Sequence, residues 1–498
     1  MTLEAYFARF RDQIIGGDQT FVSPVGLKKI LYADWTASGR AYAPIESYLQ
    51  ERILPFAANT HTGSTFTSGL ISQAYEESKV IIKQHVHADD QDVLIYCGSG
   101  MTAAVNKLQR LLGLRIPERL SHYLKNNGSC FQVDEARRPV VFVTEMEHHS
   151  NHTSWLETIA TVEIIRNDPS GNVDLNHFRQ LLKQYRGRLY KIAAVTACSN
   201  VTGIETPYQD IARLIHQQGG WCFVDFACSA PYVNIDMHPE DKDAHLDAIY
   251  FSGHKFLGGP GTPGILVFNR KLYTNEIPDQ PGGGTVAYSN PWKAHKYVEN
   301  IEAREDGGTP PYLQGIKAAL CIRLKEKMGV AQMRRREKEL LDIVFARFKQ
   351  IENAVILEGS ATERLGVVAF MIRGAHYNLI VKLLNDHFGI QLRGGCSCAG
   401  TYGHYLLKVD QGSSEKVLAD IRAGDLSSKP GWVRLSIHPT MTDEDIHLIM
   451  DGIADIAANY QVLSSDYHYC RETNEFVCAS SPAAKTVAFN YDVFSVAI

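Results

Sequence analysis

Short apolar runs alternate with amphipathic stretches from about residue 96 to residue 268. Five of these runs are continuous enough to predict strands buried on both faces, at 140–144, 192–196, 222–225, 248–251 and 265–268. Between two of them, Ile211, Leu214 and Ile215 recur at helical spacing, and Gly219-Gly220 ends the predicted helix. Strands and helices in this rhythm predict an α/β domain with a mainly parallel sheet.

The rest of the chain divides where this pattern changes. A Gly- and Pro-rich excursion at 278–311 precedes a helical segment at about 312–353, and a smaller α+β unit follows to about residue 460. We expect four parts: an N-terminal segment packed with the small domain (1–40), a large domain (41–325), a small C-terminal domain (326–462) and a C-terminal extension (463–498).

The composition limits the classes of function. With 498 residues, of which 45% are hydrophobic, the chain is too apolar for general disorder. Lys and Arg number 50 and Asp and Glu 55, a formal net charge of −5, so no nucleic-acid partner is expected. No apolar run suits a signal peptide or a membrane helix, and the ten cysteines are scattered. These features favour a reduced, cytoplasmic protein without a membrane partner.

One lysine occupies an unusual place for a charge. Lys255 follows the strand predicted at 248–251 directly, in the run Ser252-Gly-His-Lys255, and glycines come after it. Asp225 ends another predicted strand, and His148 lies in Glu-His-His-Ser-Asn after a third. Gly98-Ser-Gly-Met-Thr102 precedes a predicted helix whose first amides could hold a phosphate. A lysine amine, a carboxylate, a helix N-terminus and a flat ring are what pyridoxal phosphate needs from a protein.

On these residues the chain resembles the class V aminotransferases, fold-type I enzymes that use pyridoxal 5'-phosphate, over roughly residues 31–449. Within that superfamily it is most similar to cysteine desulfurases and selenocysteine lyases. The resemblance implies catalytic roles for Lys255 (the Schiff-base lysine), Asp225 (the pyridinium partner) and His148 (the ring-stacking residue). It implies further cofactor ligands at Gly100, Met101, Thr102, Asn200, Cys228, Ser252 and His254. The family usually has Gln or His where this chain has Cys228, a weaker donor, so Asn200 is expected to carry more of the contact with the phenolic oxygen.

The resemblance also implies a substrate side and a second subunit. Arg434 matches the arginine that grips the substrate α-carboxylate, a planar anion suited to a bidentate fork. Arg393, Asn200 and, in an N-terminal loop, His61 are further substrate-side candidates, although His61 could equally be an ordinary surface or core residue. Thr309 lies in a loop like the one whose threonine reaches the cofactor phosphate of a neighbouring subunit, which implies a homodimer.

The loop Arg393-Gly-Gly-Cys396-Ser-Cys398 resembles the desulfurase loop with its nucleophilic cysteine, and alignment on Arg393 places that cysteine at Cys398. Cys396 could relay a persulfide, both residues could be ordinary turn residues, and zinc is disfavoured because Cys-x-Cys lacks the usual spacing. We therefore expect no metal site. The expected activity is removal of sulfur or selenium from L-cysteine or L-selenocysteine, giving L-alanine and an enzyme persulfide for a protein acceptor. The alternatives are another class V activity on an amino acid without a cysteine nucleophile, or a scaffold without turnover, which the presence of both Lys255 and Asp225 disfavours.

Overall fold

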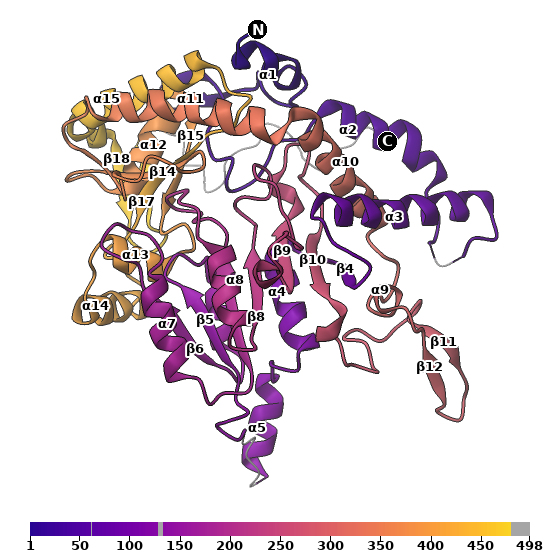
Figure 1. The fold of residues 1–498 in the computed structure, drawn as a ribbon. Helices are drawn as coiled ribbons and strands as arrows, with labels where there is room; N and C mark the ends of the chain where they lie inside the picture. The colour runs from indigo at the N-terminus through magenta and orange to yellow at the C-terminus, as the bar shows by residue number, and fades with distance from the viewer. Residues whose placement is uncertain (61, 128–132, 480–498) are drawn as a thin grey trace.

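The computed structural model describes residues 1–60, 62–127 and 133–479. A seven-stranded sheet has the order β4-β10-β9-β8-β7-β5-β6 (Figure 1). Its strands are β4 (Asp92–Cys97), β5 (Val140–Thr144), β6 (Thr161–Ile165), β7 (Lys191–Thr196), β8 (Trp221–Asp225), β9 (Ala248–Ser252) and β10 (Gly264–Asn269). Four neighbouring pairs are parallel, and β10 runs antiparallel to both of its neighbours. The predicted α/β class with a mainly parallel sheet is confirmed.

Helices pack on both faces of this sheet because its strands are apolar at successive positions. Phe142 and Val224 share one core with α7 (Leu175–Gln184), α8 (Tyr208–His216) and α10 (Tyr312–Met328). The next residue in β5, Val143, lies in the opposite core with α4 (Gly100–Leu111) and α6 (His149–Leu156). Successive side chains of a strand point to opposite faces, so a strand covered on both faces is apolar throughout.

Two predicted helix boundaries are wrong. The helical segment expected at 312–353 is divided into α10 and α11 (Val330–Phe348) at Gly329, whose φ of 79° interrupts a right-handed helix. The helix expected from residue 103 begins at Gly100, because the glycines before it allow the chain to turn into the helix earlier. The hydrophobic periodicity of the sequence indicates neither the break at Gly329 nor the earlier start at Gly100.

A second, antiparallel sheet has the order β13-β14-β17-β16. It consists of β13 (Ala354–Ile356), β14 (Val367–Ile372), β16 (Arg393–Gly395) and β17 (Trp432–Ser436), with α12 (Tyr377–Phe388) and α15 (Asp443–Leu463) nearby (Figure 1). The short helices α13 (Gly400–Leu406) and α14 (Gln411–Arg422) lie between β16 and β17 in the chain. The hairpin of β18 (Tyr467–Cys470) and β19 (Glu475–Cys478) packs on α12, where Tyr467 Oη donates to Asp386 Oδ2 at 3.0 Å. Residues 480–498 of the expected extension lie outside the described residues.

The N-terminal segment connects the two sheets. Glu4, in α1 (Leu3–Arg11), pairs with Arg336 of α11 at 3.1 Å, and β3 (Leu31–Tyr32) runs parallel to β15 (Ile390–Gln391). Further along, the Gly39 amide donates to the His254 carbonyl at 2.9 Å. The Ser436 amide of β17 also donates to the Ala33 carbonyl at 2.8 Å, so this segment contacts both the small sheet and the loop after β9.

The remaining elements belong to neither of these sheets. They are β1 (Thr20–Ser23), β2 (Gly26–Lys29), α2 (Ala43–Tyr48), α3 (Phe66–His85), α5 (Glu118–Asn126), β11 (Val286–Ser289), β12 (His295–Tyr297) and α9 (Ile301–Arg304). In Figure 1 the β11–β12 hairpin extends away from the body at the lower right. Among the described residues, no helix combines the length and apolar composition needed to cross a bilayer.

A substitution at Gly39 tests the close approach of the N-terminal segment to the loop after β9. A Cβ at this position would lie 1.9 Å from the Phe256 carbonyl oxygen, and two backbones cannot easily separate. We expect Gly39→Ala to lower the free energy of unfolding by about 1–3 kcal/mol, as overpacking does. Gly187→Ala, where a Cβ meets nothing within 4 Å, is the matched control and should change stability by less than about 1 kcal/mol. Urea denaturation measures both, and equal midpoints would contradict the close packing of this segment.

Candidate active site

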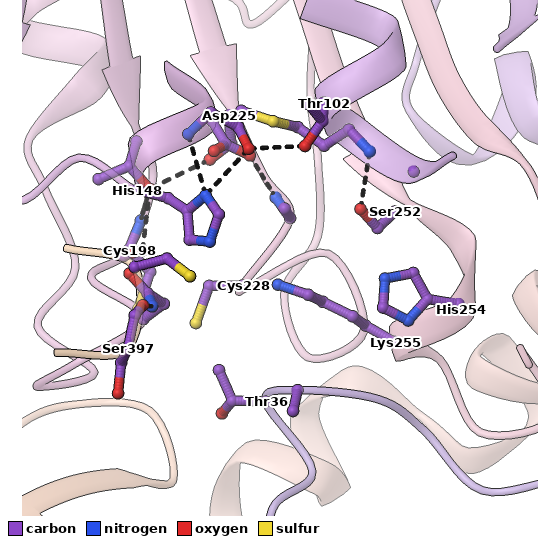
Figure 2. A pocket seen from close by; sticks show the side chains of 18 of the residues that line it. Thr36, Thr102, His148, Cys198, Asp225, Cys228, Ser252, His254, Lys255 and Ser397 are labelled. Carbon is purple, nitrogen blue, oxygen red and sulfur yellow. Dashed lines mark hydrogen bonds between the residues drawn. The ribbon is translucent and has the colours of Figure 1, made fainter. Parts of the chain in front are cut away.

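A cavity of about 390 Å³ opens where the carboxyl ends of β7, β8 and β9 face the small sheet (Figure 2). Ligands of open parallel sheets bind at this edge. The lining residues are Thr36, Ala37, Ser99, Gly100, Met101, Thr102, His148, Ser150, Thr196, Cys198, Asn200, Asp225, Ala227, Cys228, Ser252, His254, Lys255, Thr262, Arg393, Ser397, Cys398 and Arg434. Every candidate site residue predicted from the sequence is in this set except two. Thr309 is exposed and does not line the cavity, and His61 lies outside the described residues.

Lys255 extends from the turn after β9 into the cavity, toward Cys228 (Figure 2). Burial lowers the pKa of its amine, and Cys228 and then Asp225 counteract this effect. Within the described part of the chain, its Nζ forms no ion pair. A lysine amine with a lowered pKa is more often unprotonated and therefore nucleophilic.

Asp225 ends β8 and is 2% exposed. Its Oδ1 accepts a hydrogen bond from the Ala227 amide at 2.7 Å. Burial raises the pKa of this carboxyl to about 6, while the Ala227 amide and Lys255 act in the opposite direction. A buried carboxylate in this position attracts a cationic or proton-bearing group.

The first turn of α4 forms one wall of the cavity. Ser252 Oγ accepts the Met101 amide at 2.8 Å, whereas the N-cap residue Ser99 makes no side-chain hydrogen bond to the helix. Gly100 has a φ of +62°, and a Cβ there would lie 2.9 Å from Ser252 Oγ, so both conformation and space favour glycine. Amides at a helix N-terminus that no side chain accepts bind anions such as phosphate.

His148 caps the N-terminus of α6. Its Nδ1 accepts the Ser150 amide at 3.1 Å, so the neutral ring carries its proton on Nε2. Burial, with Lys255 as the next cause, lowers the pKa of His148 to about 3. The ring is thus an uncharged plane at neutral pH.

Glu147 is a buried carboxylate that lies behind the cavity and was not assigned a role from the sequence. Its Oε1 accepts the Thr144 amide at 3.2 Å, the Thr144 hydroxyl at 2.7 Å and the Thr196 amide at 2.8 Å. Its Oε2 accepts Asn151 Nδ2 at 2.7 Å. Burial raises the pKa of Glu147 to about 8, although these hydrogen bonds lower it.

Two arginines line the wall formed by the small sheet. Arg393 and Arg434 are directly opposite each other on the antiparallel strands β16 and β17. Like charges in this position are destabilising unless an anion lies between or beside them. Arg434 Nη2 donates to Asp34 Oδ1 at 2.6 Å and Nη1 to the Asn200 carbonyl at 3.2 Å, while its buried Nε finds no acceptor in the described part of the chain.

The loop after β16 has two residues with positive φ, Ser397 (51°) and Cys398 (56°). The His149 amide donates to the Cys398 carbonyl at 2.7 Å, and Asn200 Nδ2 donates to the Ser397 carbonyl at 2.7 Å. Cys398 lines the cavity together with Lys255, whereas Cys396 packs against a separate apolar cluster. The two cysteines of this loop therefore have different surroundings.

Among the described residues, two clusters consist of side chains of the kinds that bind metal ions, and neither cluster is part of the cavity lining. In one, the rings of His216 and His245 stack 3.9 Å apart at 6°, so their nitrogen lone pairs do not converge on one ion beside Asp247. The other consists of Asp89, Asp92 and His238, where His238 Nε2 is 2.5 Å from Asp92 Oδ2.

Sequence reasoning missed several residues of the cavity. Cys198 is one of the lining residues, and Asp34 accepts a hydrogen bond from the lining residue Arg434. Asp34 lies two residues beyond the end of β3, so it carries a signal similar to the one that identified Asp225, an acid at or near the end of a strand. The partner of Asp34 could not be found this way, because it is 400 residues distant in the chain.

The family model for aminotransferase class-V matches residues 31–449. The chain therefore belongs to this family, whose members are pyridoxal-phosphate-dependent enzymes, and the predicted resemblance is confirmed. Among curated relatives, the probable cysteine desulfurase of Staphylococcus aureus (strain COL) is 26% identical over 376 residues, which cover 75% of this chain and 84% of the relative. That of Staphylococcus epidermidis (strain RP62A) is 26% identical over 379 residues, with the same coverage.

Solved structures agree on the fold. The apo cysteine desulfurase of Thermococcus onnurineus NA1 superposes with a TM-score of 0.68 at 23% identity, covering 86% of this chain and 95% of the other. The cysteine desulfurase CsdA (S-sulfonic acid) of Escherichia coli has a TM-score of 0.67 at 19% identity, covering 91% and 98%. The expected fold type I is thereby confirmed.

The pKa of His148 gives a pH-dependence test. It falls from an ordinary 6.5 to about 3 in the folded chain. Between these values the unfolded chain binds one more proton at this residue, so stability rises with pH over that range and is lost as the pH falls from 6.5 toward 3. When the pH is lowered from 7 to about 5, we expect the free energy of unfolding to fall less for His148→Gln than for the parent protein. Urea denaturation at each pH measures this free energy. An unchanged pH slope would show that His148 protonates in the folded chain.

Proposed function

We propose that the cavity binds pyridoxal 5'-phosphate, with Lys255 as the amine that bonds its aldehyde carbon. The donor set supports this proposal, because Lys255 has no ion-pair partner in the described structure and Asp225 is a buried carboxylate beside it. The first turn of α4, with Ser252 and His254, would hold the phosphate, Asp225 the ring nitrogen and neutral His148 the ring face. Asn200 and Cys228 would lie at the phenolic edge. All these residues line one cavity.

When bound, pyridoxal phosphate supplies an electron sink that allows bonds at the Cα of an amino acid to break. The Asp225 carboxylate would keep the ring nitrogen protonated, which strengthens that sink. Lys255 would act as the base for this chemistry, since burial keeps its pKa lowered. His148 stays neutral and adds no positive charge.

The reaction that the cavity supports best is desulfuration of L-cysteine or L-selenocysteine. The observation that carries it is the position of Cys398, which lines the same cavity as Lys255. The Cys398 thiolate would attack the substrate sulfur, the bond from sulfur to Cβ would break, and its electron pair would return to Cβ, which takes a proton. L-Cysteine and the Cys398 thiol thus give L-alanine and a Cys398 persulfide. The cysteine desulfurase relatives support this activity.

Arg434, with Arg393 opposite it, would bind the substrate α-carboxylate. Within the described residues, Arg434 Nε and Asn200 Oδ1 are buried polar atoms without a hydrogen-bond partner, and both would be available to an amino acid. Asp34 holds the Arg434 guanidinium from the other side. Asp34 and the Asn200 carbonyl engage the two Nη atoms, so Nε would be the donor that turns to the α-carboxylate.

The persulfide requires a sulfur acceptor, for which we propose a thiol-bearing protein that reaches the mouth of the cavity. We also propose that the chain acts as a homodimer in which Thr309 contacts the other subunit's cavity. Thr309 is exposed, and the nearby β11–β12 hairpin carries Tyr288 and Trp292 at 61% and 82% exposure. Large aromatic side chains at this exposure favour a covering partner. The cytoplasmic location stays a prediction.

Sedimentation equilibrium tests the dimer. We expect the full chain to sediment as a dimer and Trp292→Glu to shift it toward monomer, because a charge at an apolar interface is costly to bury. Leu189→Glu, a substitution at another exposed apolar residue, is the control and should leave the mass unchanged. A fully active wild-type monomer would contradict the role of Thr309.

Lys255→Ala tests cofactor attachment. Borohydride reduction should fix pyridoxal phosphate covalently to the wild-type chain and not to the variant, because only a primary amine at the aldehyde carbon gives a reducible bond. Lys271→Ala, at an exposed lysine, should retain full covalent labelling. Mass spectrometry of the reduced protein makes the measurement, and equal labelling of Lys255→Ala would refute the assignment.

Cys398→Ser and Cys396→Ser test the nucleophile. With L-cysteine, Cys398→Ser should form alanine at least about 10³-fold more slowly, since other groups do not replace a nucleophile. Cys396→Ser should keep most alanine formation, because Cys396 does not line the cavity. Alanine and sulfide are measured separately. An inactive Cys396 variant beside an active Cys398 variant would reverse the assignment, and unchanged turnover of an amino acid by both would favour a class V activity without a cysteine nucleophile.

A further inference from the structure

Two cysteines of the cavity wall, Cys198 and Cys228, take no chemical step in the proposed reaction, although Cys228 would lie beside the cofactor. Cys198 follows β7 and Cys228 follows β8, and these strands are parallel neighbours with Thr196 opposite Asp225. The residues just beyond them therefore emerge side by side. The sulfur atoms lie 3.6 Å (Cys198) and 3.7 Å (Cys228) from the same Ser199 carbonyl oxygen. Figure 2 shows both sulfurs turned toward one space beside Lys255.

The two thiols differ in accessibility and acidity. Cys228 is 6% exposed and faces the cavity, while Cys198 is completely covered. The neighbouring Cys198 thiol, and then Lys255, lower the pKa of Cys228 against the effect of burial. Burial and the adjacent Cys228 raise the pKa of Cys198. A reachable thiolate with a covered thiol beside it is the arrangement of a reactive and a resolving cysteine.

Two buried cysteines elsewhere in the described chain, Cys97 and Cys321, have different surroundings. Burial raises the pKa of Cys97 and of Cys321 to about 12, and neither lines the cavity. Within the described residues, the cysteines that line the cavity are Cys198, Cys228 and Cys398. Cys198 and Cys228 share one small apolar cluster that does not include Cys398.

We propose that Cys198 and Cys228 form a reversible disulfide when hydrogen peroxide enters the cavity. The Cys228 thiolate attacks one peroxide oxygen, the O–O bond breaks, and the departing hydroxide takes a proton and leaves as water. The resulting sulfenic acid is attacked by the Cys198 sulfur, whose proton goes to the departing hydroxyl, and a second water leaves. Two thiols and one peroxide give one disulfide and two waters, with two electrons passing from sulfur to oxygen.

This disulfide would act directly on the cavity. It removes the thiol beside Lys255 and joins the strand ends that carry Asn200 and Asp225. The proposal does not rest on desulfuration, because it concerns only these two thiols and an added oxidant. If the cavity does hold the cofactor, oxidation should stop turnover and a dithiol reductant should restore it.

The test uses the full chain with Cys396→Ser and Cys398→Ser, so that the thiols of that loop cannot contribute. The protein is treated with one equivalent of hydrogen peroxide, quenched in acid, alkylated and digested for peptide mapping. We expect the loss of two free thiols per chain, a joined peptide pair containing Cys198 and Cys228, and recovery of both thiols with dithiothreitol. Loss of thiols without that peptide pair would overturn the proposal.

Two further variants in the same background separate the steps. Cys198→Ser should stop at the Cys228 sulfenic acid, which dimedone traps, and form no joined peptide. Cys97→Ser, at a covered cysteine outside the cavity lining, should form the joined peptide as fully as its parent. An unoxidised Cys228 in the Cys198→Ser protein would also overturn the proposal, since Cys228 is the thiol that meets the oxidant first.

Discussion

The Glu147 carboxylate holds together the strand ends on which the cavity is built. It accepts backbone amides from Thr144 at the end of β5 and from Thr196 at the end of β7. Thr196 is in register with Asp225, and Asp225 with Tyr250 in β9. A displacement at Glu147 would thus shift His148, Asn200 and Asp225 together. Hydrogen bonds of a buried polar group contribute about 0.5–1.5 kcal/mol each, and each donor left unsatisfied without it would cost about 1–3 kcal/mol.

Charge in the cavity is distributed between the two sheets. Lys255 and Asp225 come from the large sheet, whereas Arg393 and Arg434 come from the small sheet, with Asp34 from the N-terminal segment as a counter-ion. Positive charge exceeds negative charge, so anions such as phosphate and carboxylate are favoured. The two arginines also lower the pKa of His148, which remains a neutral ring between the two walls.

The sequence was sufficient to predict much of the large sheet and many of the cavity residues. Lys255 and Asp225 each follow a run of apolar residues, and the carboxyl ends of parallel strands meet at one edge, so local pattern predicts their proximity. Contacts between distant segments were inaccessible to the same reasoning. The pairing of Asp34 with Arg434, and the approach of Cys198 to Cys228, depend on strand order and register, which local periodicity does not encode. The break at Gly329 depends on one backbone angle.

The contact between Asp34 and Arg434 has a consequence for synthesis of the chain. Asp34 leaves the ribosome 400 residues before its partner. At about 5–20 residues per second, the N-terminal segment waits on the order of 20–80 s before Arg434 exists. During that interval β3 also lacks β15, so an unpaired strand edge and an acid without its counter-ion are exposed to the cell. The cavity consequently cannot be completed until Arg434 has been synthesised, and this early segment is where we expect molecular chaperones to be needed most.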